Sequence, residues 1–325
     1  MSRTVFVTGG AGYVGSHCCK AFAARGWNVV VFDNLCRGWR EFVRWGPLIE
    51  GDVRDPDAIA RAVAETRPDI VAHFAALAYV GESIQQPGPY YETNAGGMIN
   101  LLNAMTAAGV DKVLFSSSCA TFGEPQAPLI DERHPQSPIN PYGWSKLIAE
   151  KMLADYGVAH GIRSVALRYF NAAGDDPDLE IGERHEPETH MIPLAIRAAM
   201  QPDAVFRING DDFDTRDGTA VRDYVHVTDL ADAHIRAIDH LMDGGASHAF
   251  NLGTGRGLSV KEILDKVEQL SGRPIRREVG PRRPGDPGAL VASPAKAAEV
   301  LGWSPVNSGI DDILRSAWRW HEHAG

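Results

Sequence analysis

Cysteine and long apolar runs are scarce in this chain of 325 residues. Its four cysteines are Cys18, Cys19, Cys36 and Cys119. They form no C-x-x-C pair and lack the spacing of metal ligands, which argues against a disulfide framework and a cysteine-based zinc module. No apolar run is long enough to cross a bilayer, and no apolar signal segment precedes the first strand. We therefore expect a cytoplasmic protein without a membrane anchor.

Concentrated positive charge is also missing. The formal net charge is −10, and acidic and basic residues are interspersed without a basic stripe or tail. This distribution gives no indication of binding to nucleic acid or to an anionic membrane. An anionic ligand would have to be held by local dipoles and by individual arginines. With 44% hydrophobic residues, the chain can bury a large core and is long enough for two domains.

Three glycines follow the first apolar run. Residues 5–7 are typical of a buried strand, and Gly9, Gly12 and Gly15 come directly after it at intervals of three. The first would permit a tight turn, the second a close approach of backbone to a pyrophosphate, and the third close packing of helix on strand. Free N–H groups at the start of the next helix would attract an anion. The turn favours a dinucleotide site, although any tight strand-to-helix turn selects glycine.

An acidic residue ends the second apolar run. Asp33 follows residues 28–32 and lies eighteen residues beyond Gly15. A carboxylate at that place accepts hydrogen bonds from the adenosine ribose hydroxyls and repels a 2′-phosphate, which favours NAD over NADP. The alternative is a turn or helix cap, a frequent role of aspartate. Asp52, after a short third strand, could hold the adenine amino group or cap the following helix.

The pattern of apolar runs predicts the fold class. Strands and helices alternate over residues 4–168, which indicates an α/β fold with a Rossmann-type, doubly wound parallel sheet. Helices are expected over 87–108 and 141–160. Beyond residue 171, loops rich in Gly, Pro, Asp and His dominate. An apolar run at 224–227 suggests a return to the sheet.

Two domains are expected from this change of character. The second would be smaller and discontinuous, with loops closing over the carboxyl ends of the strands. The predicted NAD-binding domain comprises residues 1–170 plus about 222–250, and the predicted α/β substrate domain about 171–221 plus 251–325.

A tyrosine and a lysine share one face of the helix expected at 141–160. Tyr142 and Lys146 are spaced i,i+4. A nearby ammonium favours phenolate over phenol and lowers the tyrosine pKa toward the working pH. Such a tyrosine can take a proton from a sugar hydroxyl while a hydride leaves the same carbon. An ordinary helix start would give the same pair, so its weight comes from the glycine turn, Asp33 and the strand-end serines 116–118 before it.

Longer motifs run through nearly the whole chain. They include TGGAGYVGSH at 8–17, SSSCATFGEP at 116–125, PYGWSK at 141–146, RYFNAAG at 168–174 and DGTAVRDYVHVTDLADAH at 217–234. In these motifs the chain resembles the extended short-chain dehydrogenase/reductases, and among them the UDP-glucose (UDP-galactose) 4-epimerases. The resemblance implies reversible C4 oxidation of a UDP-sugar through a 4-ketopyranose. It also implies an NAD that is regenerated in each turnover and stays bound.

The resemblance assigns roles to the matching positions. Tyr142 would be base and acid at O4, Lys146 would hold the nicotinamide ribose and tune the tyrosine, and Ser118 would hydrogen-bond O4. Asn94 would support the active-site helix. The implied cofactor residues are Gly9, Gly12, Tyr13, Val14, Asp33, Asn34, Asp52, Val53, Phe74, Ala75, Ala76, Asn94, Ser116, Tyr142, Lys146 and Tyr169. The implied substrate residues are Ser118, Tyr142, Asn171, His190, Met191, Arg222, Tyr224, Arg283, Asp286 and Leu290.

Three positions depart from the best-known relatives. Ala78 stands where those carry a lysine near the pyrophosphate. His190 stands where they have an asparagine near uracil or diphosphate. Leu290 takes the place that limits bulk at the sugar 2-substituent, which is a large tyrosine in some relatives and small in others. We therefore expect UDP-glucose and UDP-galactose to be used well and N-acetyl sugars poorly or not at all.

Other functions fit parts of the pattern. A sugar-nucleotide 4,6-dehydratase needs an acid and a base after the fifth strand, and the serines Ser117 and Ser118 found there cannot perform that proton transfer. Epimerases of UDP-xylose/UDP-arabinose, UDP-glucuronate or UDP-N-acetylglucosamine share the C4 chemistry and stay open as alternatives. A dinucleotide-sensing regulator would be expected to lose Tyr142 or Lys146.

Two further expectations concern partners and metals. The helices at 87–108 and 141–160 resemble the family's dimer-forming pair, which suggests a homodimer. His185 and His190 imitate a zinc helix, but they are five residues apart with a proline between them. We interpret that stretch as solvated loop and expect no metal.

Overall fold

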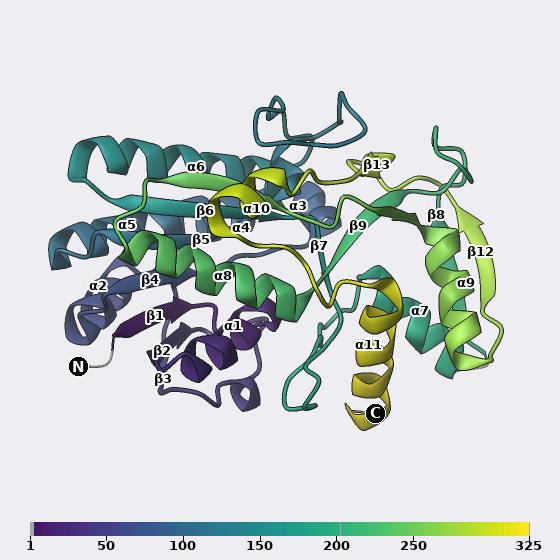
Figure 1. The fold of residues 1–325 in the computed structure, drawn as a ribbon, viewed down its shortest axis with the longest axis horizontal. Helices are drawn as coiled ribbons and strands as arrows, with labels where there is room; N and C mark the ends of the chain where they lie inside the picture. The colour runs from purple at the N-terminus through teal and green to yellow at the C-terminus, as the bar shows by residue number, and fades with distance from the viewer. Residues whose placement is uncertain (1–2, 202, 325) are drawn as a thin grey trace.

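One large parallel sheet organises the computed structural model, which describes residues 3–201 and 203–324 (Figure 1). The sheet has seven strands in the order β10-β6-β5-β4-β1-β2-β3, and neighbouring strands are parallel. They are β1 (Thr4–Thr8), β2 (Asn28–Asp33), β3 (Leu48–Glu50), β4 (Ile70–His73), β5 (Lys112–Ser118), β6 (Arg163–Tyr169) and β10 (His248–Leu252). The order reverses between β1 and β4, so the predicted doubly wound α/β fold is confirmed.

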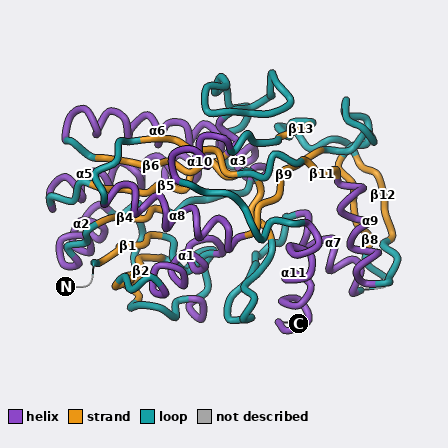
Figure 2. Tube along the Cα trace, viewed as in Figure 1, coloured by secondary structure: helices purple, strands orange, loops and turns teal. Residues whose placement is uncertain are grey.

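Helices cover both faces of this sheet, as the purple and orange segments of Figure 2 show. Side chains along a strand alternate between the faces, so Val5 and Val7 pack with α1 and α8 while Phe6 packs with α2, α5 and α6. These helices are α1 (Tyr13–Ala24), α2 (Pro56–Thr66), α5 (Gly97–Ala108), α6 (Pro141–His160) and α8 (Val227–Met242). Among the described residues, none of the helices combines the length and apolarity that a bilayer crossing requires.

The ends of α6 show how local sequence sets an element. The Asn140 side chain accepts a hydrogen bond from the Gly143 N–H at 2.8 Å, and Pro141 occupies the first turn. Gly161 ends the helix in the left-handed conformation at φ 73°. The predicted helix at 141–160 is therefore confirmed. The stretch predicted at 87–108 consists of α4 (Pro87–Tyr90), the π-helical η2 (Tyr91–Gly96) and α5, preceded by α3 (Val80–Gln85).

A second group of elements lies to the right of the main sheet in Figure 1. Its core is formed by side chains such as Ile196, Ile263 and Ile313 from three helices. Its strands are β7 (Asn171–Ala173), β8 (Val205–Asn209), β9 (Val221–His226), β11 (Gly257–Ser259), β12 (Arg276–Gly280) and β13 (Ala289–Leu290), and its helices are α7 (Met191–Met200), α9 (Val260–Ser271) and α11 (Ile310–Ala324). The remaining elements are α10 (Ala295–Leu301) and the 3₁₀ helices η1 (Arg40–Phe42) and η3 (Cys119–Thr121).

The expected return of residues 224–227 to the main sheet is wrong. That run belongs to β9, which pairs with β7, β11 and β13 in a separate four-stranded sheet. The buried Asp223 carboxylate explains the placement, because it accepts hydrogen bonds from the backbone N–H groups of Thr254, Gly255 and Ala292. The strand that does complete the main sheet is β10, beside β6.

Candidate active site

A cavity of about 510 Å³ opens at the carboxyl ends of the main-sheet strands. Residues that follow β1, β2, β4, β5 and β6 line one part of it, and residues from β9 and from the segments before α7 and β13 line the other. This is the edge at which open α/β sheets bind ligands. Of the residues predicted from the sequence, all line this cavity except Asp52 and Asn94.

The glycine turn leaves a bare backbone surface at one end of the cavity. Gly9 has φ 74°, and an added Cβ would lie 2.4 Å from the Ala75 nitrogen, so neither the conformation nor the space admits a side chain. A Cβ on Gly15 would lie 2.2 Å from the Gly9 carbonyl oxygen. Gly12 has no such obstacle within 3.4 Å and caps α1 without a side-chain hydrogen bond. The helix N-terminus is therefore free to meet an anion.

Asp33 lies at the end of β2, where the sequence placed it. Its Oδ1 accepts a hydrogen bond from the Leu35 N–H at 2.8 Å and its Oδ2 one from the Ala11 N–H at 3.0 Å. Burial raises the pKa of the Asp33 carboxyl group, and these two backbone bonds oppose the rise. Each oxygen keeps a further lone pair for a hydroxyl donor from the cavity.

Asp52 does not itself line the cavity. The Asn34 side-chain amide donates to Asp52 at 2.9 Å, and the Arg54 guanidinium pairs with the same carboxylate at 2.6 Å. The bonds from Arg54 lower the Asp52 pKa to about 2. Asp52 thus lies behind Asn34, which lines the cavity, and orients it.

Tyr142 and Lys146 face the cavity from the first turns of α6. The Lys146 Nζ lies 5.9 Å from the Tyr142 ring centroid and donates to the Ser116 carbonyl at 2.7 Å. Burial lowers the Lys146 pKa to about 7, and the Glu150 carboxylate opposes this shift. Burial raises the Tyr142 pKa to about 12, although a hydrogen bond with Ser118 opposes it. The predicted lowering of the tyrosine pKa by the ammonium is wrong, because desolvation by burial dominates.

The serines at the end of β5 complete this part of the cavity. Ser118 is buried, and its hydroxyl oxygen accepts a hydrogen bond from the Ala120 N–H at 3.1 Å. The Ser116 hydroxyl is hydrogen-bonded to the Tyr169 hydroxyl. Both predicted residues of this strand end therefore line the cavity beside Tyr142.

Asn94 supports the site from behind. Its side chain accepts from the Leu77 N–H at 2.8 Å and donates to the Leu77 carbonyl at 3.0 Å and to the Ser145 hydroxyl at 2.9 Å. Asn94 sits in the π-helical turn and is buried. It joins the loop after β4 to the helix that carries the tyrosine.

Basic and aromatic residues line the other end of the cavity. Arg222 from β9 forms an ion pair with Asp286, and Arg283 and Tyr224 line the same region. The Asn171 side-chain amide donates to the Asp223 carbonyl at 3.2 Å. The predicted His190, Met191 and Leu290 also line the cavity. Two arginines from distant segments thus converge in a region able to hold a diphosphate.

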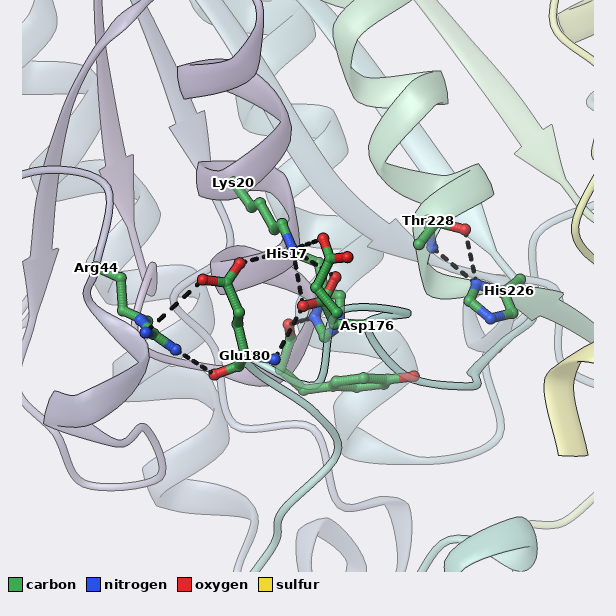
Figure 3. Close-up of polar contacts among 9 residues, drawn as sticks. His17, Lys20, Arg44, Asp176, Glu180, His226 and Thr228 are labelled. Atoms are coloured by element: carbon green, nitrogen blue, oxygen red, sulfur yellow. Dashed lines mark hydrogen bonds and ion pairs between the residues drawn. The ribbon is translucent and has the colours of Figure 1, made fainter. Parts of the chain in front are cut away.

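The segment between β7 and α7 closes one wall of the cavity and is tied to α1. Figure 3 shows Lys20 of α1 between Asp176 and Glu180, with Nζ–O distances of 2.8 Å to both. Residues 185–190 form a loop in which Glu186 and Pro187 are exposed, as expected, but the Glu188 side chain is only 3% exposed. Sequence analysis missed this wall because its many charged residues are typical of exposed loops, and their pairing partners lie far away in the chain.

The comparisons with known proteins agree with this geometry. Residues 5–253 match the model of the NAD dependent epimerase/dehydratase family. This chain belongs to that family. Within the family, it is 52% identical to a UDP-glucose 4-epimerase of Rhizobium meliloti (strain 1021) over 98% of this chain and 97% of the relative.

Solved structures of family members resemble the fold closely. A UDP-glucose 4-epimerase from Brucella ovis in complex with NAD has a TM-score of 0.94 and 51% identity, covering 98% of each chain. One from Bifidobacterium longum in complex with NAD⁺ and UDP has a TM-score of 0.94 and 38% identity, again covering 98% of each chain. The resemblance inferred from the motifs is thereby confirmed.

Proposed function

We propose that this protein interconverts UDP-galactose and UDP-glucose by reversible oxidation at C4 through a 4-ketopyranose, using a tightly bound NAD. The observation that carries the proposal is one cavity lined by the glycine turn and Asp33, by Ser118, Tyr142 and Lys146, and by two arginines. The full-length similarity to UDP-glucose 4-epimerases supports the same conclusion.

The residues present fit NAD. The bare backbone at Gly9 and Gly12 and the uncapped start of α1 would hold the pyrophosphate, and Asp33 would accept the adenosine ribose hydroxyls. Lys146 would bind the nicotinamide ribose. When bound, NAD⁺ supplies the acceptor for the hydride from C4 and returns it, so that no net redox change occurs.

Tyr142 moves the proton at O4 in this proposal. Its phenolate takes the hydroxyl proton from O4 during oxidation, and the phenol returns a proton to O4 when the 4-ketone is reduced on its opposite face. Ser118 holds O4 by a hydrogen bond. Additional positive charge in the cavity would favour the phenolate, which burial alone disfavours. Arg222 and Arg283 would hold the diphosphate, for which Arg222 must release Asp286.

A related assignment concerns the sugar. Leu290 is buried and contacts the cluster formed by Cys119, Phe122 and Phe170. A side chain of this size leaves limited room for a 2-acetamido group, which supports glucose and galactose over N-acetyl sugars. Epimerases of UDP-xylose/UDP-arabinose, UDP-glucuronate or UDP-N-acetylglucosamine are the alternatives.

The assignment of the domains and of the cellular compartment completes the proposal. The main sheet and its helices would form the NAD-binding domain, and the elements around β9 and α7 the substrate domain. The free cysteines, three of them buried and Cys36 exposed, support a reducing compartment such as the cytoplasm.

The test is turnover without added cofactor. Purified protein is incubated separately with UDP-galactose, UDP-glucuronate, UDP-arabinopyranose and UDP-N-acetylglucosamine, and the products are separated by chromatography. We expect UDP-galactose to give UDP-glucose, and Tyr142→Phe to slow this conversion by roughly 10²–10⁴-fold. Conversion of only the acid, the pentose or the acetamido sugar would assign that UDP-sugar as the substrate. No conversion even with added NAD would refute the proposed reaction.

A further inference from the structure

Two histidines and two glutamates meet on the wall between β7 and α7. Ligand atoms of Glu183, His185 and His190 all lie within 4.8 Å of one another. The His185 Nε2 is 3.4 Å and the His190 Nδ1 3.2 Å from Glu183 Oε1. The Glu188 Oε1 lies 2.9 Å from the same His190 Nδ1. Four metal-binding side chains therefore converge within a loop of eight residues.

Glu188 accepts hydrogen bonds from His190 Nδ1 and from two backbone N–H groups, but one nitrogen of this cluster is left without a partner among the described residues. The His185 Nε2 is fully enclosed and, within residues 3–201 and 203–324, has no hydrogen-bond partner. The side chains of Glu183 and Glu188 are each only 3% exposed. A buried polar group without a partner is destabilising, so an arrangement like this calls for a ligand.

The local charge points to a cation. Asp175 is buried beside Glu183 and accepts a hydrogen bond from the Glu183 N–H, and the Glu183 and Glu188 carboxylates both contact the His190 Nδ1. The fold thus brings several carboxyl groups together with too little positive charge nearby to neutralise them. Either protons or a metal ion must neutralise them.

A neighbouring cluster shows how the same loop neutralises its other carboxylates. Asp176, Asp178 and Glu180 also come within metal-binding distance of one another. There the Lys20 ammonium lies 2.8, 2.7 and 2.8 Å from the three carboxylates, and Figure 3 shows it pointing between Asp176 and Glu180. The ammonium group already neutralises these carboxylates. The Glu183 cluster has two imidazoles in place of an ammonium.

We propose that Glu183, His185 and His190 bind a divalent transition-metal ion, with Zn²⁺ as the best match. Two imidazole nitrogens and one carboxylate oxygen are donors that suit zinc, whereas magnesium and calcium prefer oxygen alone. All three residues line the cavity, so an ion that they hold would lie at its wall. Glu188 holds the loop beneath, because its carboxylate accepts from the Thr189 and His190 N–H groups at 2.7 Å.

Metal content tests the site without any turnover. The full-length, NAD-containing protein is treated with a chelator, desalted, titrated with ZnCl₂ and passed through a sizing column before elemental analysis. We expect one zinc per chain, a Tm that rises with free zinc, and no corresponding uptake of magnesium. His185→Ala and His190→Ala should each weaken zinc binding at least about tenfold.

Matched variants separate this site from adventitious binding. His248→Ala alters the other close histidine pair, His240 and His248, whose ring centroids are 5.5 Å apart, and Cys36→Ser removes the exposed thiol. Neither should change the zinc content. The His190 side chain is 40% exposed, so His190→Ala should fold even if His185→Ala does not. No retained zinc, equal zinc in wild type and His190→Ala, or zinc lost with Cys36→Ser would each overturn the proposal.

Discussion

Lys146 shows a conflict between function and stability within a single residue. Its ammonium group is 3% exposed, and burial lowers its pKa to about 7 from the ordinary value of 10.5. The protein keeps this costly group because a donor is needed at the Ser116 carbonyl and in the cavity. The adjacent Glu150 limits the cost, and it is itself held by Arg168 at 2.5 Å.

Replacing the lysine should stabilise the nucleotide-free protein in a pH-dependent way. Between pH 7 and 10.5 the unfolded chain binds more protons at Lys146 than the folded one, so wild-type stability rises with pH. Lys146→Met should therefore raise the free energy of unfolding most below pH 7, on the order of a few kcal/mol, and less as the pH approaches 10. Urea unfolding at pH 6 and pH 9 measures this.

The control is Lys151→Met, which removes an exposed lysine from the same helix. It should change stability by less than about 0.5 kcal/mol at both pH values. A gain for Lys146→Met that is independent of pH would contradict the explanation.

Single residues also mark where sequence reasoning succeeds and fails. The positions of Gly9, Gly12, Asp33 and Tyr142 could be predicted, because their spacing follows from the strand–turn–helix geometry. The sign of the Tyr142 pKa shift could not, because it depends on how much of the phenol the folded chain buries.

At the scale of elements, the contact between α1 and the wall between β7 and α7 depends on one lysine. Lys20 pairs with three carboxylates of that wall, which hydrogen-bond it and raise its pKa. Asp176 is among them and is only 3% exposed. Removing the ammonium leaves this carboxylate buried without a cation.

Lys20→Met should therefore destabilise the protein by roughly 1–3 kcal/mol and open residues 175–189 to proteolysis. Thermal unfolding and limited proteolysis with mass spectrometry measure both effects. Arg25→Met, which breaks the exposed pair of Arg25 with Asp239 near the end of the same helix, should cost at most about 1 kcal/mol and leave that loop resistant. Equal effects of the two variants would contradict this role of Lys20.

The elements differ in how much of them the sequence reveals. The bounds of α6 could be predicted because its cap, its first proline and its terminal glycine are all local. The partners of β9 could not, because an apolar run indicates a strand without saying which sheet receives it. The burial of Asp175 and Asp176 in the wall at 175–189 was missed for a similar reason, since Lys20 lies more than 150 residues away.

At the scale of the whole molecule, we infer a homodimer formed by α5 and α6. Apolar side chains are exposed on these helices and on the turn before α5, including Tyr91 of η2 at 37%, Ile99 of α5 at 40% and Trp144 of α6 at 44%. We expect a dimer in sedimentation velocity at micromolar concentration and a shift to monomer with Ile99→Asp. Val306→Asp, at a residue 79% exposed in the loop before α11, is the control and should stay dimeric. A monomeric wild type would refute the inference.

The last strand of the main sheet has a consequence for biosynthesis. β10 pairs with β6, yet the chain between them builds much of the second group of elements and α8. A ribosome adding 5–20 residues per second needs about 4–16 s to pass from residue 170 to residue 252. During that interval the nascent sheet presents an unpaired β6 edge, and α1 lacks its neighbour α8. The emerging polypeptide therefore exposes an aggregation-prone strand edge and helix face for several seconds, while chaperones can bind them.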